Sequence, residues 1–227
     1  YYLKILLTYF EKNIIIKIER FQSKKLKFFK ENLMENKKNS VIERFAKKGV
    51  FPYQFALTLL IPIRNIFLSP QKLIERLELK EGDNVLEVGA GPGYFSLKVA
   101  KFLKNGRLTL ADIQQEMLDI AKKRLAKRKV SNSEYYLCNG TKFEIEDNKF
   151  DVIYMVTVLG EIENQKEYIG EFYRMLKPNG ILSISEQGGD PDKMSVEEIE
   201  ELLKDFNFEF YKLYGTKNNF TINFKKK

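Results

Sequence analysis

The sequence contains no histidine and no tryptophan, and Cys138 is its single cysteine among 227 residues. The absence of histidine removes the side chain that most often acts as a general base or binds a metal ion. Any proton transfer would therefore fall to a carboxylate, a tyrosine, a lysine or water, and we expect no metal site. One cysteine cannot form an internal disulfide, and Cys138 lies in an apolar run. We therefore expect a buried structural thiol in a reducing compartment.

Long hydrophobic runs are also absent. Lys4, Glu11, Lys12 and Lys17 interrupt the apolar residues near the start of the sequence, so no stretch there reaches the roughly 20 residues that span a bilayer. We find no secretory signal with a small-residue cleavage site either. These absences predict a cytoplasmic protein.

The charge is unevenly distributed along the sequence. Residues 1–50 hold 13 Lys and Arg against 5 Asp and Glu, so they carry the whole net charge of +8, and the remainder holds 26 of each. A neutral remainder argues against a nucleic-acid groove. Residues 1–49 are predicted to be helical. They either cap the domain with lysines in water, lie on an anionic membrane as a peripheral amphipathic surface, or form an RNA-binding arm.

The most informative stretch joins a strand, a glycine turn and a helix. Residues 85–88 read as a buried parallel strand, glycines follow at 89, 91 and 93, and residues 95–103 have helical spacing. The pattern G-A-G-P-G differs from the dinucleotide-binding G-x-G-x-x-G. Glu87 on the strand end would repel a pyrophosphate but would suit a cationic ligand. Asp112 ends the next apolar run, 19 residues after Gly93, where a ribose-binding acid is expected.

These motifs resemble those of the class I S-adenosylmethionine-dependent methyltransferases, most closely the small-molecule branch that includes quinone C-methyltransferases. Residues 87–93 match the first motif of that family and Asp112 matches its second. Residues 147–151 and 176–180 match the segments around its fourth and fifth strands. The resemblance covers residues 70–227.

The resemblance implies an α/β fold, a Rossmann-like three-layer sandwich. Its seven-stranded sheet is mostly parallel and ends in an antiparallel C-terminal hairpin. We divide the chain into residues 1–68, a basic helical extension with an apolar lid segment, and residues 69–227, the S-adenosylmethionine-binding domain. Beyond the stretch at 85–112, strands are expected at 134–138, 150–156, 181–185, 208–214 and 220–224, and helices at 70–77, 114–129, 165–176 and 196–204.

The cofactor implied by the resemblance is S-adenosylmethionine. Glu87 would lie near its methionine part or orient the glycine turn, and Asp112 would bind both ribose hydroxyls. Ile113 would pack on the adenine, and Asn139 would accept from the adenine edge although the family usually has Asp there. The backbone is expected to approach the cofactor at Gly89, Ala90, Gly91, Gly93 and Gly140.

The acceptor side is expected at the ends of the fourth and fifth strands and beneath residues 50–63. This uncharged, mostly apolar segment of 14 residues is too short to span a bilayer. Its prolines predict a short helix between them, which either packs on the sheet edge or walls the acceptor site. Gly160 stands where many relatives carry a histidine, which leaves Glu161 and Glu186 as weak catalytic candidates. The alternative is that both are ordinary loop carboxylates without a catalytic role. Candidate pocket residues are Phe51, Tyr53, Tyr94, Gly160 and Asp190.

The predicted function is methyl transfer from S-adenosylmethionine to a small, apolar or lipid-like acceptor by in-line displacement. One alternative is an RNA or protein methyltransferase guided by the basic arm. The Asn/Asp-Pro-Pro-aromatic motif of exocyclic amino methylation is missing after the fourth strand, which counts against a base as acceptor. The other alternative is a non-catalytic cofactor-binding module.

Overall fold

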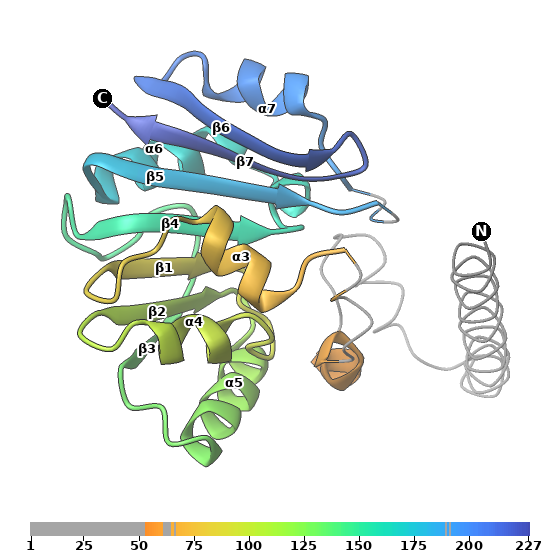
Figure 1. Cartoon of the computed structure of the whole chain (residues 1–227), viewed down its shortest axis with the longest axis vertical. Helices are drawn as coiled ribbons and strands as arrows, with labels where there is room; N and C mark the ends of the chain where they lie inside the picture. Colours follow the sequence, from red (N-terminus) through yellow and green to blue (C-terminus); the bar gives the residue numbers. More distant parts are fainter. Residues whose placement is uncertain (1–52, 61–64, 66, 189, 191) are drawn as a thin grey trace, which may run out of the picture. The chain divides into compact units, whose positions relative to one another are not determined.

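A seven-stranded sheet organises the part of the chain that the computed structural model describes, namely residues 53–60, 65, 67–188, 190 and 192–227. The strand order is β3-β2-β1-β4-β5-β7-β6, and β7 runs antiparallel to both of its neighbours, β5 and β6, whereas the other pairs are parallel (Figure 1). The predicted fold class is therefore confirmed. The strands are β1 Asn84–Val88, β2 Arg107–Asp112, β3 Ser133–Leu137, β4 Phe150–Val156, β5 Leu176–Glu186, β6 Phe208–Thr216 and β7 Asn219–Lys226.

The order of the parallel strands reverses between β1 and β4. From β1 the chain steps outward to β2 and β3, and then crosses back to β4 and β5 on the other side. In open α/β sheets, ligands bind at the carboxyl ends of the strands at such a reversal point. The ends of β1, β2, β4 and β5 are therefore the edge where a site is expected.

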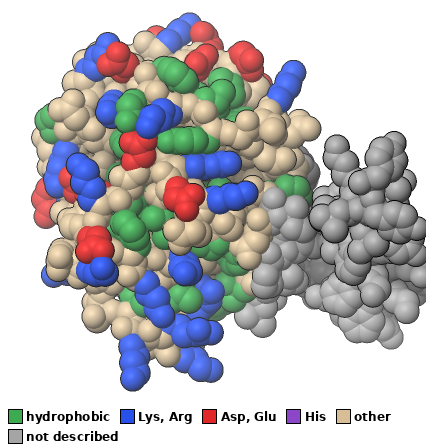
Figure 2. All heavy atoms as spheres, in the orientation of Figure 1, with side chains coloured by type: hydrophobic (Ala, Val, Ile, Leu, Met, Phe, Trp, Pro, Cys, Tyr) green, Lys and Arg blue, Asp and Glu red, His purple; other side chains and the backbone are tan. Residues whose placement is uncertain are grey.

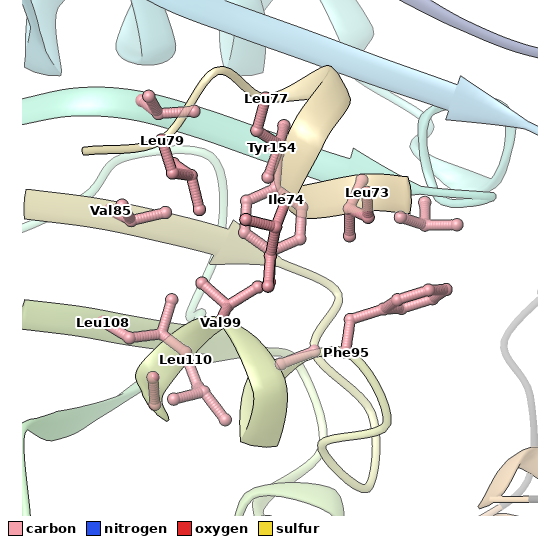
Figure 3. Close-up of a cluster of buried hydrophobic side chains, with 14 of the residues drawn as sticks. Leu73, Ile74, Leu77, Leu79, Val85, Phe95, Val99, Leu108, Leu110 and Tyr154 are labelled. Atoms are coloured by element: carbon pink, nitrogen blue, oxygen red, sulfur yellow. The ribbon is translucent and has the colours of Figure 1, made fainter. Parts of the chain in front are cut away.

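Helices cover both faces of the sheet, because the strand side chains alternate between two buried clusters. In β1, Val85 belongs to the cluster beneath α3, α4 and α5, whereas Leu86 and Val88 belong to the cluster beneath α6 and α7. Figure 3 shows the first cluster, in which Tyr154 of β4 packs among aliphatic side chains. The helices are η1 Tyr53–Leu60, α3 Pro70–Arg76, α4 Ser96–Phe102, α5 Gln115–Lys127, η3 Leu159–Glu161, α6 Gln165–Met175 and α7 Val196–Leu203.

Two helix starts follow directly from local sequence. The hydroxyl of Ser69 accepts from the backbone N–H of Lys72 at 3.2 Å, and Pro70 occupies the first turn of α3, as predicted. At α7, Ser195 and Glu198 form a reciprocal capping box. Each such cap stabilises a helix by ~1 kcal/mol because it satisfies backbone donors that the helix itself leaves unpaired.

One expected boundary is wrong. The sequence predicted a stop at residues 177–180 and a strand from 181, but β5 begins at Leu176, which pairs with Phe150. The next pair is Ile181 with Val152, so residues 177–180 bulge out of the strand and Asn179 turns there with a φ of +63°. The ammonium of Lys177 contacts both carboxylate oxygens of Asp151 at 2.8 Å and ties the bulge to β4. The other predicted ends in the described chain differ by two residues or fewer.

The segment that was expected to be a short helix between prolines forms the 3-10 helix η1. Ala56 is buried, η1 packs against α5, and Leu60 contacts the first cluster. The predictions for Phe51 and for the arm at 1–49 lie outside the described residues. Within the described chain, no helix is long and apolar enough to cross a membrane.

The surface charge of the described domain is not uniform. Figure 2 shows Lys and Arg side chains gathered at the lower end of the view, over α5. Exposed basic residues there are Lys122, Lys123, Lys127, Arg128 and Lys129. The balanced total of charges therefore conceals a locally basic end.

Candidate active site

The glycine turn between β1 and α4 has a backbone that only glycine adopts easily. Gly89, Gly91 and Gly93 have φ angles of +67°, +53° and +77°. A Cβ on Gly89 would lie 2.4 Å from Val158, and one on Gly93 would lie 3.2 Å from Ala121. At Gly91 the nearest heavy atom would be Leu59 Cδ1, 3.9 Å away. Packing therefore favours glycine at 89 and 93, whereas a Cβ on Gly91 would make only an ordinary van der Waals contact.

Asp112 joins this turn to the end of β2. Its carboxylate accepts from the N–H of Gly91 at 2.8 Å and from the N–H of Gln114 at 2.9 Å. The N–H groups of Gly89 and Ala90 donate to the carbonyl of Ala111 at 2.8 and 3.1 Å. Burial raises the pKa of Asp112, against the backbone N–H groups, which lower it. The structure therefore brings the two central motifs of the sequence together.

Glu87 points toward the start of α4. Its side chain is buried and accepts from the hydroxyl of Ser96. Burial and, to a smaller extent, Asp112 raise the pKa of Glu87 to about 7, although Ser96, Tyr154 and Arg124 act in the opposite direction. The Tyr154 hydroxyl lies close enough to Glu87 to interact electrostatically but makes no hydrogen bond of good geometry. This placement favours the second of the two expected roles, in which Glu87 orients the turn.

The side toward β3 carries the residues expected to meet adenine. Ile113 directly follows β2 and is 52% exposed, which is unusual for a large aliphatic side chain. The N–H of Cys138 donates to the carbonyl of Asp112 at 2.9 Å, so Asn139 and Gly140, both exposed, follow beside it. Cys138 is buried, and burial raises the pKa of its thiol to about 12, in agreement with a structural role.

The loop after β4 is strained and tightly packed. Thr157 has a φ of +55°, which a β-branched residue rarely adopts, and its N–H donates to the carbonyl of Ser185 at 2.8 Å. A Cβ on Gly160 would lie 1.8 Å from the backbone oxygen of Asp192. The histidine of many relatives therefore has no room here, because the loop after β5 fills its place.

Carboxylates gather where β4 and β5 end. The pKa of Glu161 is raised to about 7 by burial and by Asp190, Asp192 and Asp112. Glu186 is 1% exposed, and its pKa is raised to about 8 by burial and by Asp190 and Glu161, against Lys193. Both weak catalytic candidates thus lie at the expected edge, and Asp190 faces both of them.

Two other predicted pocket residues have different surroundings. Tyr94 is buried, its hydroxyl donates to Asn65 Oδ1 at 2.7 Å, and its ring packs edge-on against Phe95. Tyr53 is partly buried at the start of η1.

Sequence reasoning missed Ser96, because nothing in the helical spacing shows that its hydroxyl points back to Glu87. It also missed the backbone of Thr157, for which the sequence carries no signal.

A doubly wound sheet with an added antiparallel hairpin, a glycine turn after β1 and an acid at the end of β2 defines the class I methyltransferase fold. A family model described as a methyltransferase domain matches residues 79–219, which is more than half of the chain. The chain belongs to this family, the class I S-adenosylmethionine-dependent methyltransferases. The family predicted from the sequence is therefore confirmed.

Curated relatives include proteins named ubiquinone/menaquinone biosynthesis C-methyltransferase UbiE. The chain is 32% identical over 115 residues to that of Hydrogenovibrio crunogenus, with 50% of this chain and 45% of that protein aligned. It is 28% identical over 144 residues to that of Pseudomonas entomophila, with 63% and 55% aligned. The chain spans about half the length of the curated relatives it matches.

Solved structures share the fold. A S-adenosylmethionine-dependent methyltransferase from Aquifex aeolicus aligns with a TM-score of 0.74 and 24% identity, over 78% of this chain and 100% of that one. The [4+2]-cyclase SpnF aligns with a TM-score of 0.58 and 24% identity, over 64% and 57%. Because a methyltransferase and a cyclase share this fold, the function has to be argued from the residues of the site.

The described residues fit the cofactor of the family. Gly91 leaves open the space that a Cβ would take, and the Asp112 carboxylate lies beside it. A carboxylate can accept about four hydrogen bonds, so beside the backbone N–H groups that it already accepts, the Asp112 carboxylate has capacity left for a hydroxyl. Ile113 offers an exposed apolar side chain next to these groups.

Proposed function

We propose that this chain is an enzyme that transfers the methyl group of S-adenosylmethionine to a small, apolar or lipid-like acceptor. The observation that carries the proposal is the contact of the glycine turn with Asp112 at the reversal point of the sheet. The sulfonium supplies a methyl group that its positive charge already activates. The residues of the chain then have to bind, orient and exclude water.

Each motif has a distinct task in this proposal. Asp112 accepts the ribose hydroxyls, Ile113 packs on the adenine and Asn139 accepts from the adenine edge. Gly91 lets the backbone approach, and Glu87 holds the turn through Ser96. These tasks need rigid positions, which the hydrogen bonds between β1, β2 and the turn provide.

An apolar acceptor is supported by the segment next to the turn and by the names of the relatives. Leu59 of η1 is the side chain nearest to the open space at Gly91, and Leu60 packs onto the core. The relatives are named for the biosynthesis of ubiquinone and menaquinone, which are apolar quinones. Glu161 and Glu186 are the candidates that would take up a proton if the acceptor has to lose one. We also propose that residues 1–68 form the extension and lid of a domain at 69–227.

The test is calorimetric titration of the full chain with S-adenosylhomocysteine. Asp112→Ala is expected to weaken binding by about 1–3 kcal/mol, because charge-assisted hydrogen bonds to the ribose are lost. Asp112→Asn, which keeps one oxygen acceptor, should lose less. Glu116→Gln changes an exposed carboxylate on the first turn of α5 and serves as the control. Unchanged affinity in Asp112→Ala would contradict the assignment.

A further inference from the structure

An acidic cluster, made of Glu161, Glu186, Asp190 and Asp192, lies at the ends of β4 and β5. Glu161 interacts electrostatically with both aspartates, and Glu186 interacts with Glu161 and Asp190. Among the described residues, Lys193 is the cation that acts on Glu186. Its ammonium donates to the carbonyl of Lys217 at 3.0 Å and lies 5.6 Å from the centre of the Phe220 ring. Four carboxyl groups therefore lie near one another, and the ionised forms of Glu161 and Glu186 are disfavoured as long as no further cation is present.

The acidic cluster lies beside the cofactor turn, on the side away from the adenine residues. Val158 packs against Gly89, and the carbonyl of Asp192 packs against Gly160. Asn139 and Gly140 follow β3 at one side of the sheet, whereas the cluster follows β4 and β5 on the other side of β1. A nucleoside held at Asp112 thus leaves the cluster on the acceptor side.

Glu186 gives an independent indication of a ligand. Its side chain is 1% exposed, and its Oε1 atom has no hydrogen-bond partner within the described chain. The neighbouring Gln187 is 8% exposed, and its Nε2 atom is likewise unpaired there. Native proteins leave few buried polar atoms unpaired, and such atoms call for a partner. Among the described residues, no group of three or more His, Cys, Asp and Glu side chains is placed to hold a metal ion.

We propose that the acidic cluster recognises a protonated amine on the methyl acceptor, with Glu186 as its buried hydrogen-bond acceptor. This inference rests on the proposed methyl transfer and narrows the acceptor to an apolar molecule that bears an amine. An anionic phenolate would be repelled by the same carboxylates. A neutral hydroxyl could donate to Glu186 Oε1 but, unlike an ammonium, would not stabilise the ionised carboxylates around it.

The electrostatics agree with this geometry. Burial and neighbouring carboxylates raise the pKa of Glu161 to about 7 and that of Glu186 to about 8. A cation placed between them would favour the ionised forms, so its binding would release protons near neutral pH. Affinity for a cation is therefore expected to rise with pH from 6 to 9, with Asp112, Asp190, Asp192 and Lys193 as the other charged groups that face the pair.

The first arm of the test compares two cofactor analogues by titration calorimetry on the full chain. Sinefungin has an amine-bearing carbon in place of the methylated sulfur, whereas S-adenosylhomocysteine is neutral there. We expect sinefungin to bind about tenfold tighter or more, as a hydrogen bond to a charged group allows. Glu186→Gln and Glu161→Gln should reduce this ratio toward one and leave S-adenosylhomocysteine binding unchanged. Glu200→Gln, an exposed carboxylate of α7, should keep the ratio.

The second arm adds an amine and its uncharged counterpart to the complex with S-adenosylhomocysteine. Phenethylamine should raise the melting temperature and 2-phenylethanol should not, and Glu186→Gln should abolish the difference. If Glu186→Gln fails to bind S-adenosylhomocysteine, the partly exposed Glu161→Gln decides. Two results would overturn this inference and leave the proposed function standing. One is an equal effect of amine and alcohol, and the other is a ratio of sinefungin to S-adenosylhomocysteine affinity that neither glutamine variant changes. If the unmodified chain binds neither analogue, the proposed function fails and the inference fails with it.

Discussion

Replacing Gly91 by alanine separates the two demands placed on the glycine turn. The φ of +53° at Gly91 costs an L-residue about 1–2 kcal/mol. The added Cβ meets no described atom closer than Leu59 Cδ1 at 3.9 Å, so no clash adds to this cost. A loss of that size should lower the melting temperature by roughly 2–8 °C in a chain of this length.

The effect on cofactor binding should be larger than the strain alone explains. The new methyl group stands in the open space beside Asp112, where we place the cofactor. We expect the affinity for S-adenosylhomocysteine to fall by about tenfold or more, which corresponds to about 1.4 kcal/mol or more. Calorimetric titration at a temperature well below the melting transition measures this on folded protein.

Two other glycines provide matched comparisons. Gly82→Ala adds a Cβ with nothing within 4 Å and no positive φ, so stability and affinity should both be preserved. Gly93→Ala combines a φ of +77° with contacts of 3.2 Å to Ala121 and 3.3 Å to Leu125, so it should destabilise more than Gly91→Ala. A Gly91→Ala protein that loses stability but binds S-adenosylhomocysteine as well as the unmodified chain would refute our placement of the cofactor.

Three further predictions concern the acceptor side, pH and the arm. Gly160→Ala should cost about 1–3 kcal/mol or displace the loop after β5, because its Cβ would overlap the Asp192 oxygen, and urea unfolding beside Gly82→Ala measures this. Glu87 and Glu186 have folded pKa values of about 7 and about 8, raised from 4.5, so their stabilisation is complete below their unfolded pKa and is lost as pH rises through 7 and 8. Urea midpoints should therefore fall between pH 5 and 9, and less steeply in Glu186→Gln; a flat profile would contradict the burial argument. Deleting residues 1–49 should abolish sedimentation with anionic vesicles at low salt, and a full chain that does not sediment with them would remove the lipid-binding alternative.

Local signals in the sequence were enough to predict most of the sheet. Apolar runs that end in an acid or a glycine marked β1 and β2, and the loop chemistry at Ser69 marked the start of α3. The start of β5 could not be found in this way. Leu176 joins the strand because it pairs with Phe150, 26 residues away, and such a pairing leaves no trace in local composition.

The candidate site likewise has one part that the sequence predicted and one part that it did not. The contact of Asp112 with the glycine turn follows from the order of strands, so the spacing of motifs predicted it. The packing of Asp192 against Gly160 joins two loops that follow different strands. No sequence pattern in either loop indicates this contact, and none indicates the strained φ of Thr157.

This contact changes the meaning of the missing histidine. A glycine at 160 reads from the sequence as a lost catalytic group. In the structure, the missing Cβ gives room to the backbone oxygen of Asp192 from the loop after β5, and both Asp190 and Asp192 act electrostatically on Glu161. Restoring a histidine would push that loop away and disperse the acidic cluster rather than add a base to it. The acceptor chemistry of this chain therefore has to be read from its carboxylates, and Glu186, which is buried without a partner among the described residues, is the position that reports it most directly.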